Sequence, residues 1–342
     1  MKAAMSIFSR VWRVLGMGIG AFLLWNGSAF ATPILTATAT TAGFGLSQFA
    51  YNFPSTGYCC GPLGIAFPGG GKVMVSDYPG NVRIFPTDTD GQDASAIAPS
   101  ASYGSGNAVG LASLGGSIYM TQQSAGQVVE LNSDGTYNSL IVSGLPTATG
   151  IAADAANGKL YVSDCCSGSG VYEVDPVANT KNVLRGGSYD GLTVSPGGTI
   201  LYAEYNSHII GIRLSDNATV FDSGYIAGVD GTELGYGTLA GKIFANTNFG
   251  ELWQIDLANP VNQTLLVSGG TRGDFVTADP NGSLLFTQTS DIWRLTAPAG
   301  GCIGSFCGTT GSVPEPDTLP LVALGLVLVV INWRNRRSRA AL

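Results

Sequence analysis

The sequence contains only one histidine, His208. A serine or cysteine triad of the usual kind needs a histidine as its base, so any such triad in this chain would have to use that residue. His208 opens an apolar run with the pattern of a strand, away from the glycine-led runs that are expected at the centre of the fold. We therefore expect a structural or surface role for it.

Basic residues are also scarce. Residues 32–313 hold 21 acidic residues and 9 basic ones, so the body of the protein would repel a phosphate backbone. The chain has no basic stripe, no glycine-rich phosphate loop and no zinc-type cysteine spacing. These absences argue against nucleic acid and nucleotides as partners.

Glycine, by contrast, is abundant, and runs rich in β-branched and aromatic residues recur every 40 to 45 positions. Repeats of this length with several strands each are typical of four-stranded propeller blades. The six runs are Lys72-Val-Met-Val-Ser-Asp77, Ser117-Ile-Tyr-Met-Thr-Gln122, Lys159-Leu-Tyr-Val-Ser-Asp164, Thr199-Ile-Leu-Tyr-Ala-Glu204, Lys242-Ile-Phe-Ala-Asn-Thr247 and Ser283-Leu-Leu-Phe-Thr-Gln288. The sequence thus predicts an all-β fold, a six-bladed β-propeller.

A glycine precedes each of these runs and marks an inner strand, because glycine lets backbones crowd around an axis. The glycines are Gly64, Gly110, Gly150, Gly191, Gly231 and Gly273. A third strand follows each run, and a fourth follows in every unit except the last. Ile34-Leu-Thr-Ala-Thr-Ala-Thr40 has no unit of its own. We predict that this N-terminal strand closes the last blade and so removes an exposed sheet edge.

The repeats resemble the NHL and SMP-30/gluconolactonase propellers over residues 58–297. Val75-Ser-Asp-Tyr-Pro-Gly-Asn-Val-Arg-Ile-Phe85 resembles an NHL core, and Asp190-Gly-Leu-Thr-Val-Ser-Pro-Gly-Gly-Thr-Ile-Leu-Tyr202 resembles an SMP-30 segment. The second resemblance implies a divalent ion, for example Ca²⁺, that assists lactone hydrolysis.

Asp190 and Asp230, each before an inner-strand glycine, match ligand positions of the SMP-30 family. Other positions depart from it. The glutamate of the first blade would fall near Cys60 or Pro62, and the asparagine of the second blade would fall at Ala108, with Asn107 one place away. The ligand set is therefore incomplete, which favours a protein that is not an enzyme over a hydrolase.

Asp77, Asp164 and Glu204 end second strands at equivalent places. They could form an acidic, cation-attracting part of a ligand-binding face together with Asp190 and Asp230. Alternatively, the two aspartates bond turn amides, as in Asx turns, for which Glu204 is too long.

The cysteines are the most unusual chemical feature. Cys302 and Cys307 bracket a short glycine-rich loop and suggest a local disulfide. The doublets Cys59-Cys60 and Cys165-Cys166 are expected on the same face of the ring. They could each pair internally, bridge to one another, or serve a metal-thiolate or redox role. Adjacent Cα atoms are only ~3.8 Å apart, which would strain an internal bridge.

The two ends of the chain resemble export signals. Basic residues precede an apolar run at 14–25, and Ala29-Phe-Ala31 has the small residues of a cleavage site, so we expect a signal peptide at 1–31. That run is short for a membrane anchor, which needs ~20 residues. A propeller at 32–299 and a glycine-, serine- and threonine-rich linker at 300–312 would follow.

Residues 313–342 contain Pro314-Glu315-Pro316, an apolar segment expected to be helical and an arginine-rich tail. This order resembles the PEP-CTERM sorting signal, with a plain C-terminal anchor as the alternative. The resemblance implies processing by an exosortase, transient membrane association through the tail, and export to the envelope or extracellular space, alongside exopolysaccharide. We therefore expect a propeller that binds a carbohydrate, peptide or protein of the envelope or matrix through one face.

Overall fold

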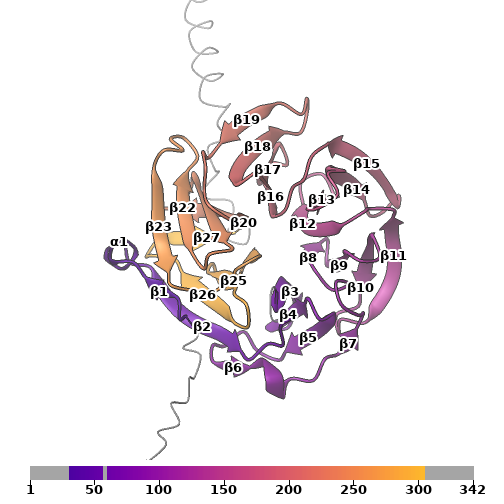
Figure 1. Ribbon diagram of the computed structural model, residues 1–342, viewed down its shortest axis with the longest axis horizontal. Helices are drawn as coiled ribbons and strands as arrows, with labels where there is room; N and C mark the ends of the chain where they lie inside the picture. The colour runs from indigo at the N-terminus through magenta and orange to yellow at the C-terminus, as the bar shows by residue number, and fades with distance from the viewer. Residues whose placement is uncertain (1–30, 57–59, 305–342) are drawn as a thin grey trace, which may run out of the picture. The chain divides into compact units, whose positions relative to one another are not determined.

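Six antiparallel sheets are arranged around one axis in the computed structural model, which describes residues 31–56 and 60–304 (Figure 1). Each sheet is a blade whose inner strand lies nearest the axis. This arrangement confirms the predicted six-bladed β-propeller. Within the described residues, no helix is long and apolar enough to cross a membrane.

The first three blades follow the repeat as predicted. Blade one consists of β3 (Pro62–Gly69), β4 (Lys72–Asp77), β5 (Asn81–Phe85) and β7 (Ala101–Ser102). Blade two consists of β8 (Leu111–Leu114), β9 (Ser117–Gln122), β10 (Gln127–Leu131) and β11 (Tyr137–Ser143). Blade three consists of β12 (Ala148–Asp154), β13 (Lys159–Asp164), β14 (Val171–Asp175) and β15 (Thr180–Arg185).

The last three blades differ more from one another. Blade four consists of β16 (Leu192–Val194), β17 (Ile200–Tyr205), β18 (His208–Arg213) and β19 (Thr219–Asp222). Blade five contains β20 (Val229–Gly237), β21 (Lys242–Thr247), β22 (Leu252–Asp256) and β23 (Gln263–Ser268), with β1 (Ile34–Leu35) and β27 (Gly301–Ile303) at its two edges. Blade six contains β24 (Val276–Ala278), β25 (Leu284–Thr287), β26 (Ile292–Thr296) and β2 (Gly45–Tyr51), extended by β6 (Gln92–Asp93).

An N-terminal strand closes blade six, as predicted, but the residues differ from those expected. The closing strand is β2, which pairs antiparallel with β26. Within the segment expected to close it, β1 pairs with β23 of blade five, and α1 (Ala37–Thr41) is a short helix capped by the Thr36 hydroxyl. The physical reason is side-chain bulk. Alanine and threonine cannot fill the interface between blades, whereas β2 buries Phe49 against Phe85 of β5.

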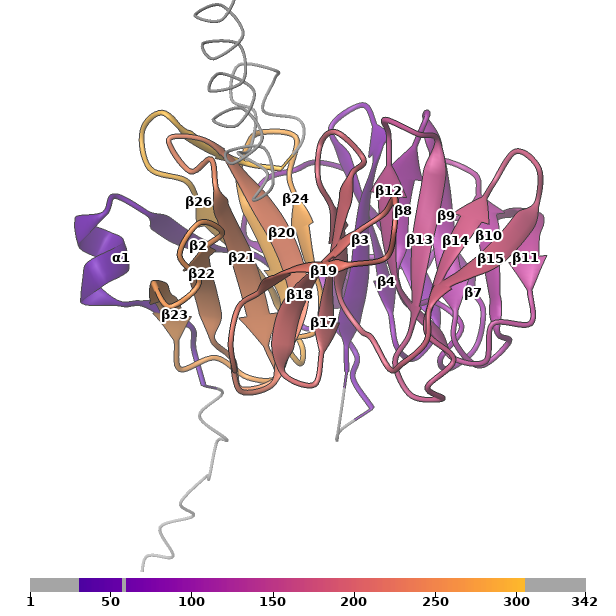
Figure 2. The same cartoon turned by 90° about the horizontal axis from the view of Figure 1, so that it is seen from above.

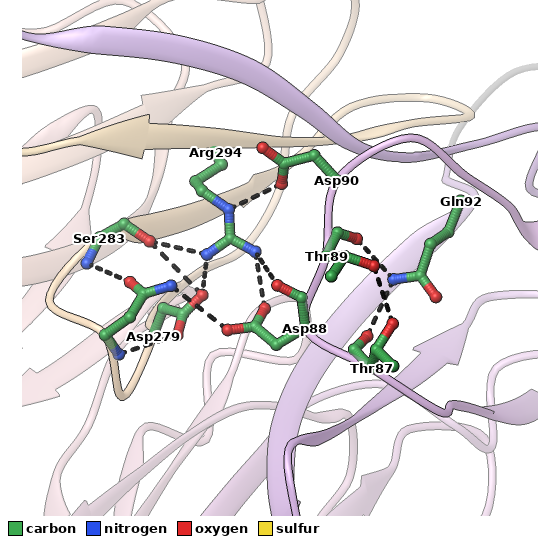
Figure 3. A network of polar contacts seen from close by, with 9 residues as sticks. Thr87, Asp88, Thr89, Asp90, Gln92, Asp279, Ser283 and Arg294 are labelled. Carbon is green, nitrogen blue, oxygen red and sulfur yellow. Dashed lines mark hydrogen bonds and ion pairs between the residues drawn. The ribbon is translucent and has the colours of Figure 1, made fainter.

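The ring is also closed by a buried arginine of β26 (Figure 3). Arg294 bonds Asp279 and Ser283 within blade six, and it reaches Asp88 at 2.6 Å and Asp90 at 2.8 Å in the loop after β5. The Arg294 side chain is 7% exposed and that of Asp279 is fully buried. The last blade is therefore joined to the first by ion pairs from the buried Arg294 to the partly exposed Asp88 and Asp90, as well as by β2 and β6.

The two faces of the ring carry different connections (Figure 2). We call the side where the inner strands begin the entry face. It holds the turns between second and third strands, and these turns bond the loops that lead to inner strands: Tyr189 N donates to Asp164 O, and Asn248 N donates to Gly228 O. The opposite side, where the inner strands end, is the exit face.

The last described strand, β27, lies at the exit face. Gly235 to Gly237, the end of β20, pair with β27. Ile303 N donates to Gly282 O in the first hairpin of blade six, and the Ile303 side chain is fully buried. The segment expected to be a linker from residue 300 therefore begins with a packed strand.

Candidate functional site

Glycines hold the inner strands together around the axis, as the sequence predicted. A Cβ on each of these glycines would collide with a carbonyl oxygen of the next blade. The pairs are Gly64 with Val109, Gly110 with Thr149, Gly150 with Asp190, Gly191 with Asp230 and Gly231 with Asp274. These contacts define five equivalent places, and the residue directly before Gly64 is the sixth. We call all six the axial positions: Leu63, Val109, Thr149, Asp190, Asp230 and Asp274.

Five of the six axial positions form an apolar side and an acidic side, and Thr149 of blade three lies between these sides in the ring. Leu63 and Val109 are buried and form a small apolar cluster with Cys60, against which Tyr78 and Phe275 pack. Asp190, Asp230 and Asp274 follow in blades four, five and six. Phe275 comes directly after Asp274, so the apolar cluster and the acidic side adjoin.

Two of the acidic side chains have buried oxygens that no described group satisfies. Oδ1 of Asp190 and Oδ1 of Asp230 are both buried without a hydrogen-bond partner. Asp230 is 2% exposed as a residue, whereas Asp190 is partly exposed. Asp274 differs, because Arg272 donates to its Oδ1 from Nε at 3.0 Å and from Nη2 at 2.7 Å. A buried oxygen without a donor is costly, which makes this cluster the candidate site.

Electrostatics favour the protonated form of these carboxyls. Burial, and then repulsion from Asp274 and Glu204, raises the pKa of Asp190 to about 8. Burial, followed by the neighbouring Asp190 and Asp274 charges, raises the pKa of Asp230 well above its usual value. Arg272 opposes both shifts without cancelling them. The positive charge of Arg272 therefore does not offset burial and mutual repulsion at Asp190 and Asp230.

The sequence placed Asp190 and Asp230 at the axis but missed Asp274. It took Gly273 as the inner-strand glycine of blade six, whereas β24 begins at Val276 and Phe275 occupies the glycine position. The available signal was the third aspartate before an inner strand, in Arg272-Gly-Asp274. Counting positions along the inner strand from its glycine therefore overlooks Asp274.

The carboxylates of Asp77 and Asp164 accept hydrogen bonds from backbone N–H groups in turns. Asp77 is 1% exposed, pairs with Arg83 and accepts from Asn81 N at 2.8 Å. Asp164 is equally buried and accepts from Cys166 N at 3.1 Å and Ser167 N at 2.9 Å. These hydrogen bonds agree with the interpretation of Asp77 and Asp164 as residues that bond turn amides.

Glu204 and His208 lie in blade four. Glu204 accepts from Ser207 N at 2.8 Å, and burial raises its pKa. Its charge acts on Asp190 and Asp230, so Glu204 adds to the acidic side. His208 opens β18 and pairs with Asp222 at 2.7 Å near the surface, as expected for a structural or surface role.

The cysteine doublet of blade three lies on the entry face. Cys165 and Cys166 are bonded to each other in the turn that Asp164 caps. Gln123 Nε2, from the equivalent turn of blade two, lies 3.4 Å from Cys165 Sγ and donates to Thr149 Oγ1 at 3.0 Å. Cys60 also takes part in a disulfide bond, and so does Cys302 in a separate one. Cys59 and Cys307 lie outside the described residues.

The axial residues do not fit a complete calcium site. Calcium takes six to eight oxygen ligands, and the apolar side supplies Leu63 and Val109 instead. One oxygen of Asp274 is already occupied by Arg272. Across residues 31–56 and 60–304, no group of three histidine, cysteine or acidic side chains is placed to hold a metal ion.

Comparison with known families identifies the C-terminal signal. Residues 312–337 match the PEP-CTERM protein-sorting motif, as the resemblance around Pro314, Glu315 and Pro316 predicted. The chain is thus a six-bladed propeller that carries a PEP-CTERM signal. This signal indicates an exported protein directed to the cell envelope, and it implies processing by an exosortase-type enzyme.

Solved structures of low sequence identity share the propeller. A protein described as a putative gluconolactonase aligns with a TM-score of 0.61 at 15% identity, covering 79% of this chain and 99% of that one. A protein described as a putative oxidoreductase (glucose dehydrogenase) from Thermus thermophilus aligns with a TM-score of 0.53 at 15% identity, covering 74% of this chain and 100% of that one. A chain of a nidogen/laminin complex aligns with a TM-score of 0.52 at 14% identity, covering 64% and 85%. Such likeness shows the fold alone. No curated protein matches the chain.

Proposed function

We propose that this protein is an envelope- or matrix-associated propeller that binds an extracellular carbohydrate, peptide or protein through its entry face. One observation carries the proposal: the buried Oδ1 atoms of Asp190 and Asp230 have no donor within the described chain. A ligand that supplies positive charge or hydrogen-bond donors would relieve this cost. The absence of a complete catalytic set among the described residues favours binding over catalysis.

The proposed organisation of the chain follows the sequence. A signal peptide at 1–31 is removed, the propeller is exported, and the segment at 313–342 associates transiently with the membrane until an exosortase processes it. Changing Pro314, Glu315 and Pro316 to alanine is expected to leave the tail uncleaved. Intact mass spectrometry of the exported protein tests this, and an unaltered mature mass would contradict it.

The binding proposal is tested on the envelope and matrix of the producing cell. Purified wild-type protein is expected to be retained on these fractions, and Asp230→Asn is expected to reduce retention. Asp216→Asn is the matched control, because Asp216 is exposed and pairs with Arg213 on an outer strand-to-strand turn. Absence of retention for the wild-type protein would refute the proposal.

A second proposal is a divalent-metal-dependent hydrolase of the gluconolactonase kind. The unpartnered oxygens of Asp190 and Asp230 favour it, whereas the apolar side of the axial positions argues against it. Metal analysis of protein purified without a chelator separates the two proposals. Stoichiometric calcium or zinc that is lost in Asp230→Ala would favour the hydrolase.

A further inference from the structure

The acidic side of the axial positions is built for a cation, yet the protein supplies too little positive charge. Asp190, Asp230 and Asp274 lie close enough for their charges to interact, and Glu204 adds a fourth negative group. Arg272 is the cation that acts on them, and its hydrogen bonds go to Asp274. This leaves Oδ1 of Asp190 and Oδ1 of Asp230 without a donor.

The acidic cluster is not merely a solvated surface. Asp230 is 2% exposed and its Oδ1 is buried and unpartnered. A buried acceptor of this kind is expensive to keep without a donor.

The kind of cation follows from what surrounds the acceptors. A calcium ion needs six to eight oxygens, whereas a primary ammonium group needs only a few acceptors for its three N–H donors. Leu63, Val109 and Phe275 can contact a hydrocarbon chain but cannot coordinate a metal ion through their side chains. Asp190 is partly exposed, so a small charged group can reach this residue from solvent.

We propose that the axial positions bind a primary ammonium group on an aliphatic chain, either a free alkylamine or the end of a lysine side chain. Asp190 and Asp230 accept its hydrogen bonds. Leu63, Val109 and Phe275 contact the carbon chain. This inference rests on the proposed binding function and names the ligand chemistry of the same face.

Calorimetric titration of the protein purified from its producing cells tests the ammonium site. The probes are hexylammonium, hexan-1-ol, tetraethylammonium and Nα-acetyl-lysine methylamide. Hexylammonium is expected to bind at 1:1 stoichiometry. Hexan-1-ol lacks the charge and tetraethylammonium lacks N–H donors, so each is expected to bind at least about tenfold more weakly. Binding of the lysine derivative would show that the site accepts a lysine side chain. If only hexylammonium binds, the site accepts a free alkylamine alone.

Variants make the assignment specific. Asp230→Asn and Asp190→Asn keep the shape of the side chain, and each is expected to weaken hexylammonium binding at least about tenfold. Asp216→Asn is expected to leave it unchanged. Circular dichroism and melting curves verify that the variants fold. If one of the two axial variants fails to fold, the other gives the result.

Bound ammonium favours ionised carboxylates, so binding near neutral pH is expected to release protons. Titrations in two buffers of different ionisation enthalpy measure this release. Equal binding of hexylammonium and hexan-1-ol, or stoichiometric Ca²⁺ binding that hexylammonium cannot displace, would overturn the inference. Matrix retention without ammonium binding refutes the inference alone. Ammonium binding without retention refutes the proposed function alone.

Discussion

Asp190 is a carboxyl group whose proton is held more tightly in the folded protein than in the unfolded chain. Its pKa is raised to about 8, chiefly by burial and then by Asp274 and Glu204, with Arg272 opposing. Between about pH 4 and 8 the folded protein keeps a proton that the unfolded chain releases. Stability is therefore expected to fall as pH rises through this range.

The Asp190→Asn variant tests this dependence. The buried group no longer ionises, so the variant is expected to gain stability relative to wild type as pH rises, by at most about 1.4 kcal/mol per pH unit. Urea unfolding at pH 5, 6, 7 and 8 measures the difference. Asp216→Asn is the control, because the pKa of Asp216 is lowered, mainly by its bond from Ala218 N. Parallel curves for wild type and Asp190→Asn would contradict the prediction.

Gly191 shows why the axis requires glycine. A Cβ at this position would collide with the carbonyl oxygen of Asp230 and with Gly231. Gly191→Ala is expected to lower the free energy of unfolding by about 1–3 kcal/mol. Gly186→Ala is the matched control, since a Cβ there would meet no heavy atom within 4 Å, and its cost should stay within about 0.5 kcal/mol. Urea unfolding of both variants decides the matter, and equal losses would argue against axial crowding.

At the scale of elements, β2 rather than β1 closes blade six. Phe49 of β2 is fully buried, lies 5.3 Å from the Phe85 ring and packs beneath the Arg294 guanidinium. Phe49→Ala is expected to cost about 3–5 kcal/mol. Ile34→Ala in β1 is the control, because Ile34 is 59% exposed. Chemical denaturation measures both losses of unfolding free energy. A larger loss for Ile34→Ala than for Phe49→Ala would indicate that β1, not β2, closes the ring.

The sequence revealed the repeat more readily than the pairing of its ends. A regular spacing of 40 to 45 residues is a property of the chain itself, so six blades and closure by an N-terminal strand could be predicted. Which N-terminal residues close the ring depends on packing against Phe85, which lies in another blade. The threonine-alanine segment has strand-like composition, but Thr36 caps a helix there instead.

The candidate site was only partly predictable for a similar reason. Asp190 and Asp230 could be found from the glycine that follows each. Counting from glycine missed Asp274, since Phe275 stands in place of that glycine and the structure shows the equivalence where the Asp274 carbonyl meets Gly231. The unpartnered state of the two Oδ1 atoms of Asp190 and Asp230 depends on strands from several blades, which no local pattern records.

At the scale of the whole molecule, the ring behaves as one unit because its first and last blades are joined. Arg294 contributes to this through Asp88, Asp90 and the fully buried Asp279. Arg294→Met is expected to cost about 3–5 kcal/mol, because it leaves the buried Asp279 carboxylate without its cation. Thermal unfolding should keep a single transition at a lower midpoint.

Arg213→Met provides the comparison for Arg294→Met. Arg213 pairs with Asp216 at the surface, and exposed pairs of this kind contribute about 1 kcal/mol or less. The thermal unfolding midpoint of Arg213→Met is therefore expected to stay close to that of wild type. Equal shifts for the two variants would show that the buried network does not hold the ring closed.

The three-residue strand β27 separates the end of the described chain from the acidic cluster. β27 pairs with Gly235–Gly237 at the end of β20, whereas Asp230 lies near the start of the same strand, at the entry face. The length of β20 therefore stands between Ile303 and the carboxyls, so a ligand at the cluster would leave β27 uncovered.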